Sequence, residues 1–243
     1  MEKELTVIIT MAGLGSRFRK AGYNVPKYMI EAKGKTLFEW SMDSLEDYKE
    51  HADKYIFIVR REDDSEGFIK DKCKERGINN VQVVQIDYLT DGQATTAMLG
   101  IPYCDEDKAI MIYNIDTYVE PYEMKYADIR GEGHIPCFHA EGDHWSFVSL
   151  DDNGKAEEVR EKERISDNCT LGAYYFSSAK LYKDLYDEYY KDDSKLEKGE
   201  KYIAPLYNFM ISKGFEVTIS DINPSKVHVL GTPEELKEFL NEN

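Results

Sequence analysis

The hydrophobic residues in the first half of the chain form short runs that alternate with segments of helical spacing. The runs are rich in Val, Ile and other large side chains, which is typical of buried strands. They cover residues 5–11, 55–59, 81–86 and 109–114, with a short extended piece at 28–32. Apolar residues recur at helical spacing over 37–48 and 68–73. This order predicts an α/β fold with a mainly parallel sheet and helices on both faces.

The pattern changes after residue 120, where short strands dominate. They are predicted at residues 135–139, 146–150, 155–160, 170–176, 215–220 and 227–230, with helices at 179–190, 203–211 and 234–240. Residues 151–154, Asp-Asp-Asn-Gly, form a hairpin signal. Thr232 and Pro233 give the last helix an N-cap and a first-turn proline. We therefore predict one domain, with an α/β part over 1–120 and a small β-rich lobe over 121–243.

The charge balance excludes some classes of partner. The 243 residues carry a net charge of −16, and residues 36–243 hold 24 basic against 44 acidic side chains. A surface of this kind repels nucleic acid and anionic membranes, so we expect neither as a partner. The length is sufficient for a substantial core.

Cysteine use and apolar-run length indicate the compartment. The four cysteines are Cys73, Cys104, Cys137 and Cys169. Their spacing of 31 to 33 residues, without a C-x-x-C pair, argues against a zinc ribbon or disulfide scaffold and fits a reducing environment. Neither a secretion signal nor an apolar run near about 18 residues is present, so we expect a cytoplasmic protein. His134, His139 and His144 match no metal-ligand spacing.

A glycine-containing loop follows the first predicted strand directly. Gly13 and Gly15 allow backbone conformations closed to other residues, so residues 12–17 could form a concavity of main-chain N–H groups that binds an anion. Residues 12–35 hold six Lys or Arg against one acidic residue, in a chain that is otherwise strongly acidic. This concentration predicts a site for a strongly anionic ligand.

Other motifs fit these glycines less well. A dinucleotide fingerprint needs a third glycine, but Phe18 stands at that position. A kinase-type P-loop ending at Gly34-Lys35-Thr36 would need its first glycine at position 29, where Met29 stands. A plain turn with surface cations remains the structural alternative.

The spacing of the basic residues is similar to that of a known family. Gly13-x-Gly15-x-Arg17 is followed ten residues after the arginine by Lys27 of Pro26-Lys27. This order resembles the signature of the nucleotidyltransferases that make nucleotide sugars. The resemblance implies a Rossmann-like, mainly parallel sheet with a small β-rich acceptor lobe, and nucleotide binding within 1–120. It also implies that the loop Ala12, Gly13, Leu14 and Gly15 wraps an NTP triphosphate, and that Arg17 and Lys27 neutralise its phosphates.

Two later segments resemble the nucleotide side of the same family. Asp91-Gly92-Gln93 is similar to the family's base-reading loop, which implies base contacts by Gly92 and Gln93. Asp116 follows the fourth predicted strand in an N-x-D sequence, where the family places a Mg²⁺ ligand. An isolated aspartate there could also cap the next turn.

The acceptor side is matched at two segments. Glu161-Lys162 resembles the family's V-x-E-K-P motif, which implies that Glu161 binds acceptor hydroxyls and Lys162 binds the acceptor phosphate, although Glu163 replaces the proline. A charged, solvated strand end is the alternative. Gly172 lies in a strand similar to the family's T-x-G-x-Y-x-F, where the glycine leaves room for the acceptor.

A second family position is not matched. The Asp that often supplies a second Mg²⁺ ligand is Val229 in this chain. Asp221 or a water could substitute, one carboxylate with the triphosphate could suffice, or the protein could bind nucleotide without turning it over.

The resemblance implies a reaction and leaves three interpretations open. A phosphate monoester would attack the α-phosphorus of an NTP, with Mg²⁺ as cofactor and pyrophosphate as leaving group. The first interpretation is a sugar-1-phosphate nucleotidyltransferase that supplies NDP-sugars for capsule or other surface polysaccharide. The second is a cytidylyltransferase for a non-sugar phosphate such as phosphocholine, and the third is a nucleotide-binding module without catalysis. The resemblance also leaves open whether the chain forms a homo-oligomer.

Overall fold

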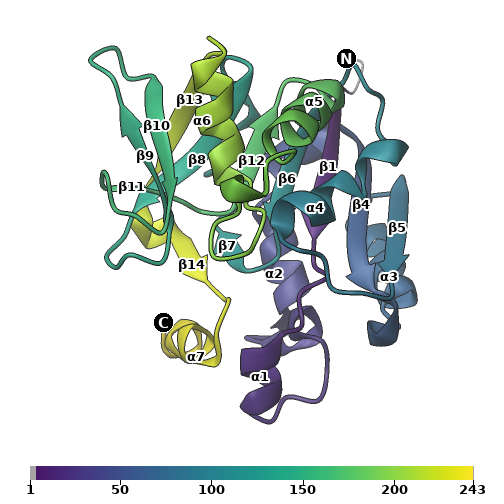
Figure 1. The fold of residues 1–243 in the computed structure, drawn as a ribbon. Coiled ribbons are helices and arrows are strands. Elements are labelled where there is room, and N and C mark those ends of the chain that lie inside the picture. Colours follow the sequence, from purple (N-terminus) through teal and green to yellow (C-terminus); the bar gives the residue numbers. More distant parts are fainter. Residues whose placement is uncertain (1–3, 243) are drawn as a thin grey trace.

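A computed structural model describes residues 4–242 (Figure 1). The strands are β1 Leu5–Thr10, β2 Glu31–Ala32, β3 Lys35–Thr36, β4 Ala52–Arg60, β5 Val81–Ile86, β6 Ala109–Asn114, β7 Thr117–Val119, β8 Gly133–His139, β9 Ser146–Leu150, β10 Ala156–Glu161, β11 Asn168–Thr170, β12 Ala173–Phe176, β13 Val217–Ile222 and β14 Val227–Val229. The α-helices are α1 Ser16–Lys20, α2 Leu37–Asp43, α3 Glu66–Glu75, α4 Gln93–Met98, α5 Ala179–Tyr189, α6 Ala204–Ser212 and α7 Pro233–Asn241.

The four strands predicted in the first half form the parallel part of the sheet. β1 pairs with β4 on one side and with β6 on the other, and β5 pairs with β4, all in parallel. Alternate residues of β1 face opposite layers, as the two-residue period of a strand requires. Leu5, Val7 and Ile9 pack with α2 and α3, whereas Ile8 packs with α4, α5 and α6. The predicted α/β arrangement with helices on both faces is confirmed (Figure 1).

The strands of the second half continue the same sheet. β12 lies antiparallel to β6, and the full strand order is β10-β9-β11-β8-β12-β6-β1-β4-β5, with β13 parallel to β8. β9 and β10 form the predicted hairpin. The β-rich lobe is therefore an extension of the central sheet, and its core is continuous with that of the first half.

Three predicted segments differ from the structure. The strand predicted over 170–176 is divided into β11 and β12, because Gly172 between them has a φ of 87° and is not extended. Residues 28–32 begin with a 3₁₀ turn over Lys27–Met29 in place of an extended start, because the Met29 N–H bonds the Pro26 carbonyl. This turn buries Tyr28, whose hydroxyl donates to Asp63 at 3.1 Å. The helix predicted over 37–48 ends at Asp43 and is followed by a 3₁₀ turn over Asp47–Glu50.

Helices α1 and α7 lie together beyond the carboxyl ends of the parallel strands (Figure 1). Phe18 of α1 and Leu236 and Phe239 of α7 share one small apolar cluster. The cluster fixes both helices close to the loops that follow β1 and β6. Within residues 4–242, no helix has both the length and the apolar character needed to cross a membrane.

His134 gives a prediction about pH and stability. Its side chain is 0% exposed and its ring nitrogens lie 2.8 Å from Thr218 Oγ1 and 3.2 Å from Ser220 Oγ. Burial lowers the pKa of His134 from 6.5 to about 4. The unfolded chain therefore binds a proton between pH 6.5 and 4 that the native protein does not, and stability falls as the pH falls through that window.

We expect a loss of roughly 3 kcal/mol in the free energy of unfolding from this group between pH 6.5 and 4. Urea unfolding of the wild type and His134→Gln at a series of pH values in this window measures it. The wild type should lose stability more steeply than the variant. Equal slopes for the two proteins would contradict the prediction.

Candidate active site

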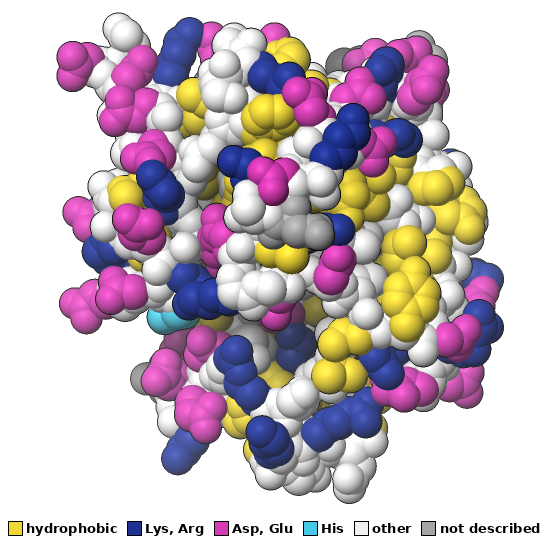
Figure 2. Space-filling model, in the orientation of Figure 1, with side chains coloured by type: hydrophobic (Ala, Val, Ile, Leu, Met, Phe, Trp, Pro, Cys, Tyr) yellow, Lys and Arg dark blue, Asp and Glu magenta, His cyan; other side chains and the backbone are white. Residues whose placement is uncertain are grey.

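A cavity of about 500 Å³ opens where the carboxyl ends of the parallel strands meet. Ligands of parallel sheets bind at this edge. Its walls come from Thr10 at the end of β1, the loop after it, the segment 25–28 and Asp63 after β4. The remaining walls are formed by Leu89, Thr90, Gly92, Gln93, Thr96, Glu200 and residues 114–116 at and after the end of β6. Figure 2 shows a hollow between the α1 segment and the body of the protein, with Lys and Arg side chains around it.

The glycine loop lies along one wall of this cavity. Ala12, Gly13, Leu14 and Gly15 all line it, and α1 begins at the next residue. Gly15 has a φ of 58°, which is the left-handed conformation expected of a glycine. Gly13 has no positive φ, and a Cβ there would meet nothing within 4 Å. Gly13 therefore leaves open space at the wall of the cavity. Of the two glycines, only Gly15 adopts the backbone conformation that was predicted to require glycine.

The positive charge of this loop is partly neutralised in the folded protein. Arg17, Arg19 and Lys27 line the cavity, but the other three basic residues of 12–35 do not. Arg19 lies 3.6 Å from Asp63, and Lys27 forms an ion pair with Asp116. Within the described part of the chain, only Arg17 of these three cations has no acidic partner. The sequence count thus overstates the charge that faces a ligand.

Lys27 and Asp116 bring together two segments that are far apart in the sequence. The Lys27 side chain is 15% exposed and its Nζ donates to Asp116 Oδ1, while the Asp116 side chain is 43% exposed. The 3₁₀ turn at Lys27 and the end of β6 place the pair on the cavity wall. A partly exposed ammonium beside a more exposed carboxylate can exchange this partner for a phosphate with little loss.

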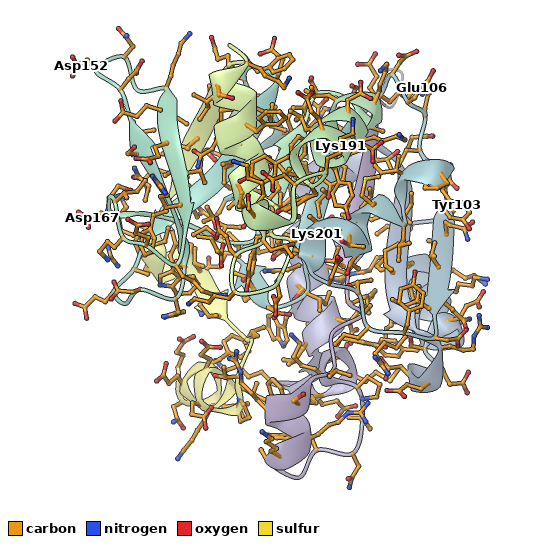
Figure 3. All side chains as sticks on the ribbon, viewed as in Figure 1. Tyr103, Glu106, Asp152, Asp167, Lys191 and Lys201 are labelled. Carbon is orange, nitrogen blue, oxygen red and sulfur yellow. The ribbon has the colours of Figure 1, made fainter. Side chains whose placement is uncertain are left out.

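The predicted base-reading loop is fixed by a segment of the second half. Gly92 has a φ of 142°, and a Cβ on it would lie 2.3 Å from the Lys201 carbonyl oxygen, so only glycine fits there. Lys201 also pairs with Asp91 at 2.9 Å. Figure 3 shows Lys201 beside α4. Gln93 Nε2 donates to Thr10 Oγ1 at 3.1 Å, which places it between the loop and β1.

A second cavity of about 330 Å³ adjoins the first. The two cavities share part of their lining, namely Arg17, Gln93, Asn114 and Asp116. The rest of the second cavity comes from residues 144–146, 161–162, 170–172, Thr117, Tyr174, Tyr202, Ile203, Val229, Gly231 and Glu235. Two anionic ligands bound in these cavities would meet at the shared wall.

Lys162 is the central cation of the second cavity. Its Nζ donates to the Tyr202 hydroxyl at 2.8 Å and lies 3.3 Å from Glu161, whose carboxylate accepts a hydrogen bond from Ser146. Burial opposes the charge on Lys162, but the hydrogen bond to Tyr202 and the carboxylate of Glu161 outweigh it and raise its pKa. The lysine is therefore charged at neutral pH. Its φ of 54° is unusual for a residue with a side chain and indicates a constrained position.

Gly172 lines the second cavity, but the space next to its Cα is already filled. Its φ is 87°, and a Cβ would lie 2.1 Å from Asn114 Nδ2. The glycine therefore makes room for the Asn114 amide at the shared wall. Only the direction of a Cβ is filled, and Gly172 still lines the second cavity, so its role beside an acceptor stays a prediction.

The positions of Val229 and Asp221 show whether either residue could supply a second metal ligand. Val229 lines the second cavity, so its isopropyl group stands where the resemblance places a carboxylate. Asp221 lies 3.9 Å from His139 and lines neither cavity, so it cannot take that place. Among residues 4–242, no group of three or more His, Cys, Asp or Glu side chains could hold a metal ion.

Sequence reasoning missed several side chains of the two cavities. They are Asp63, Asn114, Tyr202 and Glu235. Asn114 ends a parallel strand and could have been found from that position alone, whereas Asp63 lies in the 3₁₀ turn Arg61–Asp63 that follows β4. Tyr202 is 40 residues from its partner Lys162, and no local pattern links the two.

The parallel sheet, the glycine loop and the paired cavities define the nucleotide-diphospho-sugar transferase fold. A solved structure of this class, the nucleoside-diphosphate-sugar pyrophosphorylase from Vibrio cholerae RC9, is 36% identical, with a TM-score of 0.90 over 97% of this chain and 100% of that chain. The inositol-1-phosphate CTP transferase from T. maritima is 16% identical, with a TM-score of 0.75 over 100% of this chain and 98% of that chain.

A third relative matches only locally. The chain is 42% identical over 60 residues to the probable UDP-N-acetylglucosamine pyrophosphorylase of Encephalitozoon cuniculi, and the match covers 24% of this chain and 17% of that protein. No model of a protein family matches the chain. On the full-length similarity, the chain belongs to the nucleoside-diphosphate-sugar pyrophosphorylase family of nucleotidyltransferases.

Proposed function

We propose that the protein transfers a nucleotidyl group from an NTP to a sugar 1-phosphate, which gives an NDP-sugar and pyrophosphate. The proposal rests on one observation: the two cavities share a wall, and Arg17, Asn114 and Asp116 line both cavities there. An NTP in the first cavity would present its α-phosphate at this wall, and an acceptor phosphate held by Lys162 would approach from the second. As the resemblance implies, the product would be a donor for polysaccharide synthesis.

The proposed reaction needs no protein nucleophile, because the acceptor carries a charged phosphate oxygen. This oxygen bonds to the α-phosphorus while the bond from that phosphorus to the α–β bridging oxygen breaks. Pyrophosphate leaves with the electron pair. The work of the protein is to align two polyanions and to neutralise the charge between them.

The residues of the two cavities have distinct parts in this proposal. The glycine-loop N–H groups and Lys27 hold the triphosphate, and Gly92 and Gln93 face its base. Arg17 neutralises charge at the shared wall, since it has no acidic partner of its own among the described residues. Lys162 holds the acceptor phosphate, and Glu161 accepts hydrogen bonds from the acceptor hydroxyls.

A Mg²⁺ ion fits this wall because carboxylate and phosphate oxygens are its preferred ligands and one or two protein carboxylates suffice. Asp116 would hold it, since its carboxylate is 43% exposed and faces both cavities. Bound there, the ion would neutralise the triphosphate and favour the departure of pyrophosphate.

One contact favours a hydroxyl-rich acceptor over a cationic one such as phosphocholine. Aromatic rings can bind quaternary ammonium groups, and Trp145, Tyr174 and Tyr202 line the second cavity. The Lys162 ammonium, however, already lies 4.4 Å from the centre of the Tyr202 ring. A second cation at this ring would be repelled, whereas Glu161 remains available to hydroxyl groups.

The test is a panel of each NTP with Mg²⁺ and several phosphate monoesters, followed by pyrophosphate release. We expect release only with a complete pair, and with a sugar 1-phosphate as acceptor. If phosphocholine were the only acceptor that supports pyrophosphate release, the protein would be a cytidylyltransferase for a non-sugar phosphate. Nucleotide binding without any release across the panel would contradict catalysis.

A further inference from the structure

We propose that Glu235 is the second carboxylate of the cation site and replaces the acidic residue missing at Val229. The inference rests on the nucleotidyl transfer proposed above, which needs a divalent cation near Asp116. Four features of the structure support it: the conformation of Glu235, its position beside Asp116, the backbone that fixes both residues, and its unpaired oxygen.

The conformation of Glu235 departs from what its local sequence predicts. Thr232-x-x-Glu235 has the capping-box pattern, in which the glutamate turns back to the N-cap N–H. The same pattern at Thr36-x-x-Glu39 forms the full box in α2, with the Thr36 N–H donating to Glu39 at 2.9 Å. In α7 only half of the box is present, as the Glu235 N–H donates to Thr232 Oγ1 at 3.1 Å. The Glu235 carboxylate is left free for another partner.

That carboxylate faces the same point as Asp116. A Cβ built on Gly231 would lie 3.3 Å from Glu235 Oε2 and 3.6 Å from Asp116 Oδ2. The space beside Gly231 is thus bordered by one oxygen from each acid. Lys27 pairs with Asp116 Oδ1, the other oxygen of that carboxylate. Glu235, Asp116 and Gly231 all line the second cavity.

The backbone holds the two acids in this arrangement. β14 pairs with β7 so that Val229 lies opposite Thr117, directly after Asp116. The Leu230 N–H donates to the Asp116 carbonyl at 2.7 Å, which fixes the turn at Gly231 against the end of β6. The N-cap of α7 then sets the direction of Glu235. These contacts are independent of any ligand.

The charge arrangement is incomplete without a cation. Glu235 Oε2 is shielded from solvent and has no hydrogen-bond partner within residues 4–242. A buried carboxylate oxygen without a partner is costly, and a second carboxylate nearby adds repulsion. An oxygen-binding divalent ion between them would offset both effects and would complete its coordination with phosphate oxygens and water.

The test measures metal binding directly, with Mn²⁺ as a paramagnetic probe. The full chain is titrated with Mn²⁺ in the presence of a non-hydrolysable NTP analogue, and free Mn²⁺ is followed by electron paramagnetic resonance. We expect Glu235→Gln to raise the Kd for Mn²⁺ at least about tenfold. Glu234→Gln, at the exposed neighbour in the same helical turn, is the matched control and should change it less than about twofold.

Two further measurements, one of restored affinity and one of thermal stability, show whether Glu235 is a metal ligand or only a structural residue. The double variant Val229→Asp with Glu235→Gln returns a carboxylate to the same wall and should recover most of the affinity. In EDTA, Glu235→Gln should melt at or above the wild-type temperature, because it removes the negative charge of a carboxylate whose shielded oxygen has no hydrogen-bond partner and which lies near Asp116. A variant that melts well below the wild type would make Glu235 a structural residue and would overturn the assignment.

The remaining outcomes are distinct. If Glu235→Gln binds Mn²⁺ as tightly as the wild type, the assignment of Glu235 is wrong, and pyrophosphate release by the wild type would leave the proposed function intact. If the wild type binds no Mn²⁺ with or without the nucleotide analogue, the assignment is also wrong. Absence of pyrophosphate release in that case would contradict the proposed function as well.

Discussion

Lys27→Ala should lower the turnover number by about 10²- to 10³-fold while it changes the free energy of unfolding by less than about 1 kcal/mol. Lys27 is 15% exposed on the wall of the first cavity, where its charge would act on a bound triphosphate. Its loss leaves Asp116 without this partner, but the Asp116 side chain is 43% exposed and can be solvated by water. The effect should therefore fall on the reaction and not on the fold.

Steady-state pyrophosphate release and urea unfolding measure the two quantities. Lys20→Ala is the matched control, because Lys20 lies on the adjacent helix α1, is exposed and lines neither cavity. The control should retain turnover within about twofold. Normal turnover in Lys27→Ala would remove this lysine from the mechanism.

Lys162→Met should raise the KM for the acceptor by about 10- to 100-fold and leave the affinity for NTP unchanged. Methionine keeps an unbranched apolar side chain beside Tyr202 but removes the charge that would hold the acceptor phosphate. Lys162 lines the second cavity and not the first, so only one substrate should be affected. Because the two cavities are lined by different lysines, an effect on the acceptor but not on NTP tests directly which cavity binds which substrate.

Substrate-dependence kinetics and equilibrium binding of an NTP analogue separate the two substrates. Lys155→Ala is the control, since Lys155 precedes β10, pairs with Glu216 and lines neither cavity. Weaker NTP binding with an unchanged acceptor KM in Lys162→Met would reverse the assignment of the cavities.

Local patterns predicted where the strands lie in the sequence better than they predicted which strands pair in the sheet. Continuous apolar runs identify β1, β4 and β6, because strands buried on both faces need apolar residues at nearly every position. β5, at the edge of the sheet, is only partly buried and carries two glutamines. The same patterns could not show that β12 lies beside β6, since this pairing depends on segments about 60 residues apart. The second half was therefore predicted as a lobe, although its strands extend the first sheet.

The site residues that belong to one continuous motif were predicted from the sequence. Those that come together from distant segments were predicted less well. Arg17 and Lys27 both line the first cavity, and they lie ten residues apart in one segment that contains α1 and the start of the 3₁₀ turn at Lys27. Asp63 pairs with Arg19 and Asp116 pairs with Lys27, and both acids follow other strands, so a count of residues 12–35 cannot include them. The capping pattern at Glu235 forms only in part, and its carboxylate lies near the same point beside Gly231 as the distant Asp116.

The central claim is that the two cavities join an NTP and a phosphate monoester at the α-phosphorus. For the pair that releases pyrophosphate, parallel reactions with α-labelled and γ-labelled NTP follow each phosphate by chromatography. The account predicts that the α label appears in the nucleotide product that contains the acceptor and the γ label appears in pyrophosphate. Transfer of the γ label to the acceptor, or its release as single phosphate, would contradict it.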